Sequence, residues 1–137
     1  MNVLVLRSDD PATPEIDFCP LIRRKGHVYR GLTEGEWQSI RKTGVVLSDQ
    51  RYSTPDEGTC FAEEPATAES YVNFGRDDPR RTRRCTYMIE VPARFTTRDP
   101  RDGYWKARQA IPREAITRAW KMCPVSRDVI AGEEIVP

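Results

Sequence analysis

The stretches His27-Val28-Tyr29-Arg30-Gly31 and Gly58-Thr59-Cys60-Phe61-Ala62 decide the fold. Both are short runs with β-branched and aromatic residues beside a glycine, a pattern that predicts strands over 28–32 and 59–62. The second strand leads through Pro65, a favourable first residue of a helix, into a predicted helix over 66–74. Each strand is thus followed by a helix, which indicates a mixed α and β domain.

The helix after the first strand has signals at both ends. Thr33 is suited to the N-cap, and Glu36 three positions later completes a capping box. Gly44 stands where a C-terminal cap glycine belongs. Trp37 and Ile40 are spaced to share the inner face. The pattern predicts a helix that runs to about residue 43, followed by a short strand over 45–47.

The segment over 86–91 gives the clearest strand signal, because Tyr87, Ile89 and Val91 recur at every second position and share one side. Further strands are predicted over 2–7, 116–122 and 129–136, the last at a sheet edge, whereas the polar segment over 94–110 is expected to be a loop. The expected fold class is α+β: a single compact domain over 1–137 with two small antiparallel sheets and short flanking helices.

The composition of the chain indicates which partners and which cellular compartment to expect. The formal net charge of +1 gives no overall attraction to nucleic acid or to a membrane surface. No stretch approaches the 20 or so apolar residues of a membrane span. The four cysteines are scattered without a C-x-x-C pair, and the single histidine is far from them in spacing, so we expect no metal site. We predict a cytoplasmic protein.

Arg30 and Gly31 are the first candidate site residues. A glycine at a strand end lets the backbone approach a planar ligand amide, and an arginine beside it offers a fork of donors to a phosphate or a ribose. The ordinary interpretation, a solvated charge followed by a turn, stays open.

Two further residues have both a structural and a functional interpretation. Tyr71, on the inner face of its helix, is either a core residue or a platform for a ligand ring. Glu114 is either a solvated carboxylate or a group that bonds a ribose hydroxyl and stabilises positive charge on the sugar. The arginine-rich segment over 76–84 is either a solvated loop or a contact surface for a phosphate or an acidic partner.

Taken in order, these pieces resemble the ADP-ribosyltransferase superfamily. Tyr29-Arg30-Gly31 is similar to the first motif of the arginine-type transferases. The stretch from Gly58 to Glu63, with Tyr71 downstream, is similar to the second motif of the poly(ADP-ribose) polymerase branch. Glu114 falls where the family has its catalytic glutamate, at the start of a late strand, and the segment over 94–110 resembles the target-recognition loop before it.

The resemblance implies a split-sheet cleft for NAD and a mono-ADP-ribosyltransferase that releases nicotinamide. It implies catalytic roles for Glu114 and Arg30, and NAD contacts from Tyr29, Arg30, Gly31, Thr59, Cys60, Phe61 and Tyr71. NAD serves as co-substrate, and the acceptor is a macromolecule, expected to be a protein ahead of a nucleic acid. A toxin, a phage-type host modifier and a housekeeping enzyme all remain open as biological roles.

Two alternatives remain beside this hypothesis. Cys60 and Ala68 replace the tyrosine and serine of the second motif, and Pro112 stands two residues before Glu114 where many members have glutamate or glutamine. The changes at Cys60 and Ala68 leave open an inactive relative that acts as a binding inhibitor or interaction module, and Pro112 argues against a guanidinium as the modified group, which leaves the acceptor open. The other alternative is chemistry like that of the RNA 2′-phosphotransferases, which use NAD on a related fold.

Overall fold

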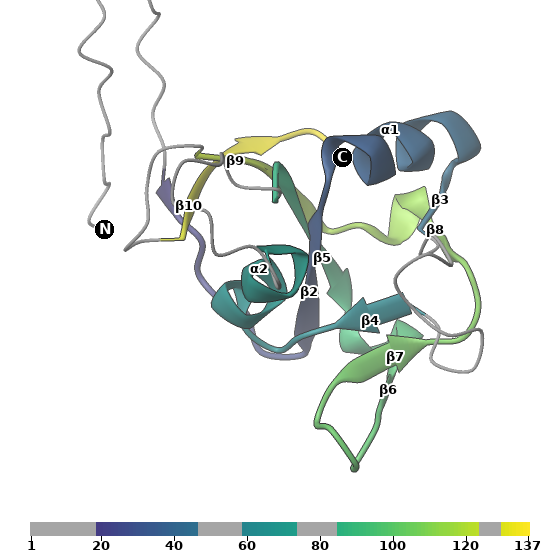
Figure 1. The fold of residues 1–137 in the computed structure, drawn as a ribbon. Helices are drawn as coiled ribbons and strands as arrows, with labels where there is room; N and C mark the ends of the chain where they lie inside the picture. Colours follow the sequence, from purple (N-terminus) through teal and green to yellow (C-terminus); the bar gives the residue numbers. More distant parts are fainter. Residues whose placement is uncertain (1–18, 47–58, 74–84, 124–129) are drawn as a thin grey trace, which may run out of the picture.

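The computed structural model describes residues 19–46, 59–73, 85–123 and 130–137 of the chain (Figure 1). The predicted strand over 2–7 and the arginine-rich segment over 76–84 lie outside the described residues. In chain order the elements are β1 (Cys19–Pro20), β2 (His27–Leu32), α1 (Glu34–Thr43), β3 (Val45–Val46), β4 (Thr59–Phe61), α2 (Pro65–Asn73), β5 (Tyr87–Pro92), η1 (Ala93–Phe95), β6 (Thr97–Arg98), β7 (Trp105–Ala107), β8 (Ile111–Pro112), η2 (Arg113–Ala115), β9 (Arg118–Met122) and β10 (Ala131–Ile135).

The strands form three antiparallel sheets. The largest has the order β1-β10-β9-β5-β2, and the smaller sheets are β4-β7-β6 and β3-β8. In the large sheet β2 and β5 run side by side, with Tyr29 opposite Glu90 and Gly31 opposite Met88. The predicted α+β class with antiparallel sheets and short flanking helices is confirmed.

One face of the large sheet contributes to the main core. Val28, Leu32 and Ile89 pack there with Trp37 and Ile40 of α1, and all five are nearly inaccessible to solvent. The same cluster takes in residues of the smaller sheets, namely Val46, Phe61, Ala107 and Ile111. Side chains alternate between the two faces of a strand, so Val28 and Leu32 of β2 point to the same face and into this core.

The other face of the large sheet packs against α2. Tyr29, Met88 and Trp120 are buried there with Ala68 of the helix. An added Cβ at Gly31 would lie 2.9 Å from the Ala68 carbonyl oxygen and 2.9 Å from a methyl group of Val72. A side chain at position 31 would therefore push α2 off the sheet.

Helix α1 has the ends that the sequence predicts. The Thr33 side chain accepts a hydrogen bond from the Glu36 amide, and Gly44 ends the helix at φ +75° with its amide donating to the Ile40 carbonyl. Trp37 stacks on Tyr87 with ring centroids 4.8 Å apart. The capping box is only half formed, because the Glu36 carboxylate binds an arginine instead of the Thr33 amide.

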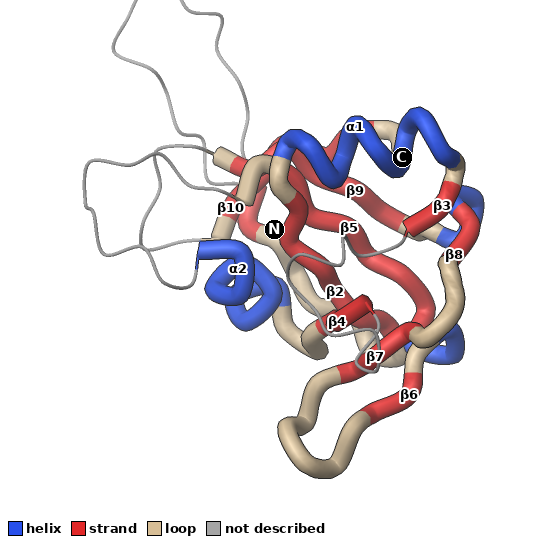
Figure 2. The backbone as a smooth tube through the Cα atoms, turned by 45° about the vertical axis from the view of Figure 1, so that its right-hand side comes forward, coloured by secondary structure: helices blue, strands red, loops and turns tan. Residues whose placement is uncertain are grey.

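The structure corrects the expected loop over 94–110. This segment contains η1 and the hairpin of β6 and β7, which projects from the body in Figures 1 and 2. The Lys106 ammonium lies between the carboxylates of Asp99 and Asp102, at 3.0 and 2.7 Å, and these contacts raise its pKa to about 12. Cross-strand charges within the hairpin order a segment whose local sequence looks like a loop.

Two strand predictions near the C-terminus also need correction. The strand expected over 129–136 is not at an edge, since β10 lies between β9 and the two-residue β1. The strand expected over 116–122 begins only at Arg118, and Glu114 lies on the short turn η2 rather than at a strand start. Pro112 at the N-terminal end of η2 favours this turn, because proline removes a ladder donor.

Candidate functional site

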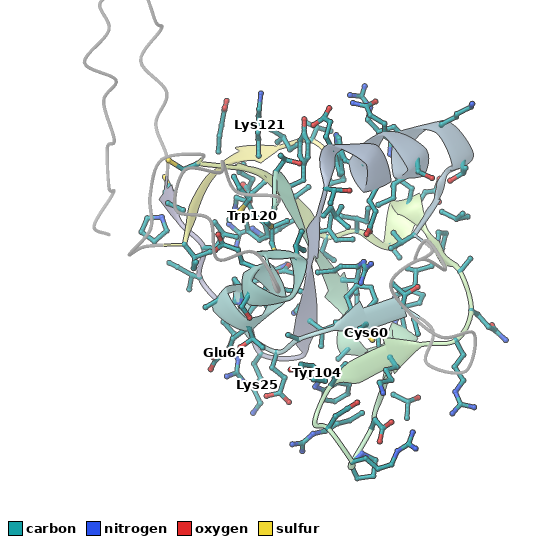
Figure 3. All side chains as sticks on the ribbon, viewed as in Figure 1. Lys25, Cys60, Glu64, Tyr104, Trp120 and Lys121 are labelled. Atoms are coloured by element: carbon teal, nitrogen blue, oxygen red, sulfur yellow. The ribbon has the colours of Figure 1, made fainter. Side chains whose placement is uncertain are left out.

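The candidate site is where β2 meets β4. Tyr29 and Ala62 exchange two backbone hydrogen bonds, of 2.7 and 2.8 Å, and this pair joins the five-stranded sheet to the three-stranded one. Within the described part of the chain, no further backbone hydrogen bond links β2 to β4. We call this interruption of the ladder the split and define it by the buried Gly31 on β2 and by Cys60 on β4, which is labelled in Figure 3.

Arg30 spans the split. One terminal nitrogen of its guanidinium donates to the Cys60 carbonyl at 2.9 Å. Its Nε and its other terminal nitrogen bind the Glu36 carboxylate at 3.1 to 3.2 Å. The Arg30 side chain is only 13% exposed, and that of Glu36 17%, so the pair is shielded from bulk water. Such a two-point contact fixes the plane of the guanidinium as well as its place.

Gly31 turns its backbone groups into the split. Tyr29 directs its amide and carbonyl toward Ala62, and in an extended strand the residue two positions on directs its own to the same side. The Gly31 N–H and C=O therefore point away from β5 and toward β4. A glycine is needed at position 31 because α2 packs directly against its Cα and leaves no room for a side chain. Its backbone N–H and C=O groups point to the split.

Tyr29 belongs to a buried polar cluster next to the split. Its ring is fully buried, and its hydroxyl donates to the Glu90 carboxylate at 2.8 Å and accepts the Arg24 amide at 2.7 Å. Glu90, also fully buried, binds the Arg24 guanidinium and accepts the Thr117 hydroxyl at 2.8 Å. The tyrosine predicted to contact NAD is thus occupied with protein partners, and its ring packs with Trp120 of the core.

The pKa values of the cluster members are shifted in directions that keep Glu90 charged, Tyr29 neutral and Arg24 charged. Burial opposes the charged form of Glu90, but hydrogen bonds from Arg24, Tyr29 and Thr117 outweigh it and lower the pKa of the carboxyl. Burial raises the pKa of Tyr29 to about 12. The hydrogen bond to Glu90 raises the pKa of Arg24. Glu90 is therefore an anion and Tyr29 a neutral donor at neutral pH.

The other predicted NAD contacts divide between core and split. Thr59 and Phe61 are buried, and Phe61 belongs to the main core. Cys60 is half-buried and offers its carbonyl to Arg30. Tyr71 lies on α2, the helix that covers Gly31, and its side chain lies outside the described part of the chain. The structure brings Arg30, Gly31 and Cys60 together.

Glu114 is not brought to this group. It is exposed on η2, and the neighbouring Arg113 amide donates to the Gly44 carbonyl at the C-terminal end of α1. Glu36 holds Arg30 from the first turn of the same helix. The stretch of helix between Glu36 and Gly44 is about 12 Å long at 1.5 Å per residue. Arg30 and Glu114 therefore lie near opposite ends of α1.

The other surface and side-chain features of the described residues do not define a second candidate functional site. An open groove of about 360 Å³ beside the start of α2 is lined by Leu21, Pro65, Ile130 and their neighbours, and none of the predicted site residues lines it. In the described ranges, no three His, Cys, Asp or Glu side chains gather as metal ligands. No described helix is long and apolar enough to cross a membrane.

Comparison with known proteins does not identify this chain: no family model, no curated protein and no solved structure matches it.

Sequence reasoning missed two carboxylates that organise this region. Glu36 looked like a capping residue, and only the fold shows that it faces Arg30. Glu90 carries the signal that a charged residue in an otherwise apolar strand, Tyr-Met-Ile-Glu-Val, needs a partner when it is buried. Its partners come from positions 24, 29 and 117, which no local pattern connects.

Proposed function

We propose that this protein is an NAD-dependent mono-ADP-ribosyltransferase that transfers ADP-ribose to a macromolecular acceptor and releases nicotinamide. The observation that supports this most is the split, where the amide and carbonyl of Gly31 point toward β4, the strand that the Arg30 guanidinium also reaches. A carboxamide has one acceptor and two donors, so it is complementary to a backbone N–H and C=O side by side.

The two residues then divide the work of binding. Gly31 holds the nicotinamide carboxamide, and Arg30, whose charge Glu36 balances, donates N–H groups to a phosphate or a ribose hydroxyl. In the reaction the bond between nicotinamide and ribose breaks, and nicotinamide leaves with the electron pair. A nucleophile of the acceptor then forms a bond to the same ribose carbon and loses its proton. A carboxylate near that carbon stabilises the positive charge in between.

The family resemblance assigns to Glu114 the stabilisation of positive charge on the ribose carbon. Because Glu114 lies at the end of α1 away from Arg30, the structure also favours a second candidate function. The ribose carbon is bonded directly to nicotinamide, so a stabilising carboxylate must lie within a few ångströms of the ring. The second candidate is a relative that binds NAD or a partner surface without turnover.

Calorimetry with NAD, followed by an assay for nicotinamide release with cell lysate as acceptor, tests the proposal. We expect Arg30→Ala to lose binding and release. Loss of release alone in Glu114→Gln supports the role that the resemblance gives to Glu114, and unchanged release shows that Glu114 is not the stabilising carboxylate. The matched controls are Arg41→Ala and Glu133→Gln, both exposed in the structure. Binding without release in the wild-type protein supports the second candidate. Absence of NAD binding contradicts the transferase and leaves only the form of the second candidate that binds a partner surface. Product from 2′-phosphorylated RNA would move the assignment to phosphotransferase chemistry.

A further inference from the structure

The split is a place where a β-ladder stops although both strands continue. In an antiparallel ladder the next hydrogen-bonded pair after Tyr29 and Ala62 is two residues along each strand, which is Gly31 with Cys60. Strand β2 continues to Leu32 and β4 extends back to Thr59, so both residues are in extended backbone. The described residues nevertheless show no Gly31–Cys60 hydrogen bond.

An arginine side chain takes the place of the missing ladder bond. The Cys60 carbonyl, which would accept the Gly31 amide in a continued ladder, accepts the Arg30 guanidinium at 2.9 Å. The ladder between β2 and β4 therefore stops at the residue whose carbonyl the Arg30 side chain binds. Arg30 therefore acts as a wedge at the point where β2 and β4 separate.

The wedge is held by Glu36 in the first turn of α1. Both carboxylate oxygens contact the guanidinium, and the Thr33 cap fixes the backbone of Glu36 through a 3.2 Å hydrogen bond. With Nε and one terminal nitrogen bound to Glu36, the other terminal nitrogen is left facing β4. The carboxylate thereby sets the direction in which Arg30 points.

We infer that Glu36 is a positioning residue: through Arg30 it keeps β2 and β4 apart, so that the Gly31 amide and carbonyl remain open to a ligand. Without the carboxylate, Arg30 loses its two-point anchor, and the Gly31–Cys60 pair closes the ladder by one step. The identity of the ligand as NAD rests on the proposed function, whereas the wedge itself does not depend on it.

Nuclear magnetic resonance of the full chain tests the wedge without any ligand. In Glu36→Gln we expect a nuclear Overhauser effect between the α protons of Arg30 and Phe61, which become close neighbours when the ladder closes. We also expect at least tenfold slower hydrogen exchange of the Gly31 amide. Glu34→Gln, an exposed carboxylate in the same helical turn, is the matched control and leaves both signals as in the wild type.

Two additional variants make the result decisive if Glu36→Gln does not fold. Arg30→Lys keeps the charge but has no fork, and Glu36→Asp shortens the reach to Arg30, so both are expected to close the ladder as well. Unchanged Gly31 exchange and no new α-proton contact in a folded variant overturn the inference.

Titration with NAD then separates the wedge from the proposed function. We expect Glu36→Gln to weaken NAD binding at least tenfold and, in an Arg30→Met background, to leave the exchange rate of the Gly31 amide unchanged. An equal slowing of Gly31 exchange in both backgrounds means that Glu36 does not act through Arg30, and overturns its positioning role. If the wild-type protein does not bind NAD, the proposed function fails, and the resonance data still decide whether Glu36 and Arg30 hold the strands apart.

Discussion

Tyr29 and Gly31 lie two residues apart on β2 and turn their backbone groups the same way, but their surroundings are opposite. Tyr29 pairs with Ala62 and sends its hydroxyl into a buried cluster with Glu90. Gly31 faces Cys60 with no ladder bond between them, because the Cys60 carbonyl is bound to Arg30. One strand thus has a closed structural region next to an open one, and the predictions below test that contrast in order of expected effect.

The largest effect is expected in the closed region, from Glu90→Gln. The substitution removes a buried anion on which Arg24, Tyr29 and Thr117 converge, and such losses cost about 3 kcal/mol in the free energy of unfolding. Urea denaturation measures the change. Glu134→Gln is the control, since its pair with Arg118 is half-exposed and contributes at most about 1 kcal/mol. Similar small losses for both variants would show that the cluster is not a structural anchor.

Alkaline pH should weaken the closed region through Tyr29. The pKa of this residue is raised to about 12 by burial, against about 10 in an unfolded chain. Its contribution is complete below pH 10 and is lost as pH rises toward 12, because the unfolded state releases its proton first. The expected loss is about 2 kcal/mol.

Denaturation of the wild-type protein and of Tyr29→Phe at a series of pH values isolates the stability lost through Tyr29 ionisation. The variant should show a shallower decline between pH 10 and 12. Tyr87 has a raised pKa as well, mainly from burial, so some decline persists in the variant. Identical slopes in the two proteins would assign the alkaline loss to residues outside the cluster.

On the open side, Gly31→Ala should destabilise the fold by about 2 kcal/mol. The new methyl group meets the Ala68 carbonyl, the Cys85 sulfur and the Val72 side chain, each at 2.9 Å, so α2 must shift. Thermal unfolding followed by circular dichroism gives the change. Gly35→Ala has the opposite expected sign, since its methyl has no neighbour closer than 3.9 Å and alanine favours the helix.

The smallest effect is expected from Thr33→Ala, at about 1 kcal/mol. The substitution removes the side-chain acceptor for the Glu36 amide at the start of α1. Because Glu36 holds Arg30, the same change should loosen the split. Hydrogen exchange across α1 measures the loss of the cap, and the control is Ser39→Ala, an exposed position in the same helix. No difference between the two variants would mean that the cap is redundant.

The elements that were predicted well are those with local causes. Thr33 and Gly44 mark the ends of α1, Trp37 and Ile40 define its inner face, and the alternation in β5 is visible in sequence. The hairpin of β6 and β7 and the two-residue β1 were missed, since each is held by pairing with residues that no local pattern selects.

Part of the arrangement at the split could be predicted from the sequence. Arg30, Gly31 and Cys60 come together because β2 and β4 meet, and the two motifs that contain them were identified from sequence. Glu114 was expected beside these residues but lies at the other end of α1. The turn η2 that contains it is held there by a backbone hydrogen bond to Gly44. A motif order constrains which residues share a region, but not the distance between their side chains.

The sequence by itself determined the class of fold, the ends of α1 and the arginine–glycine pair on a strand, because propensities, caps and periodicity act within a few residues. Only the tertiary structure decided that β2 and β4 meet at one residue pair, that Arg30 is held by Glu36, and that Glu90 is the centre of a buried cluster. These features join residues up to 66 positions apart in the chain. Whether such groups meet depends on the packing of the whole core, which no local pattern encodes.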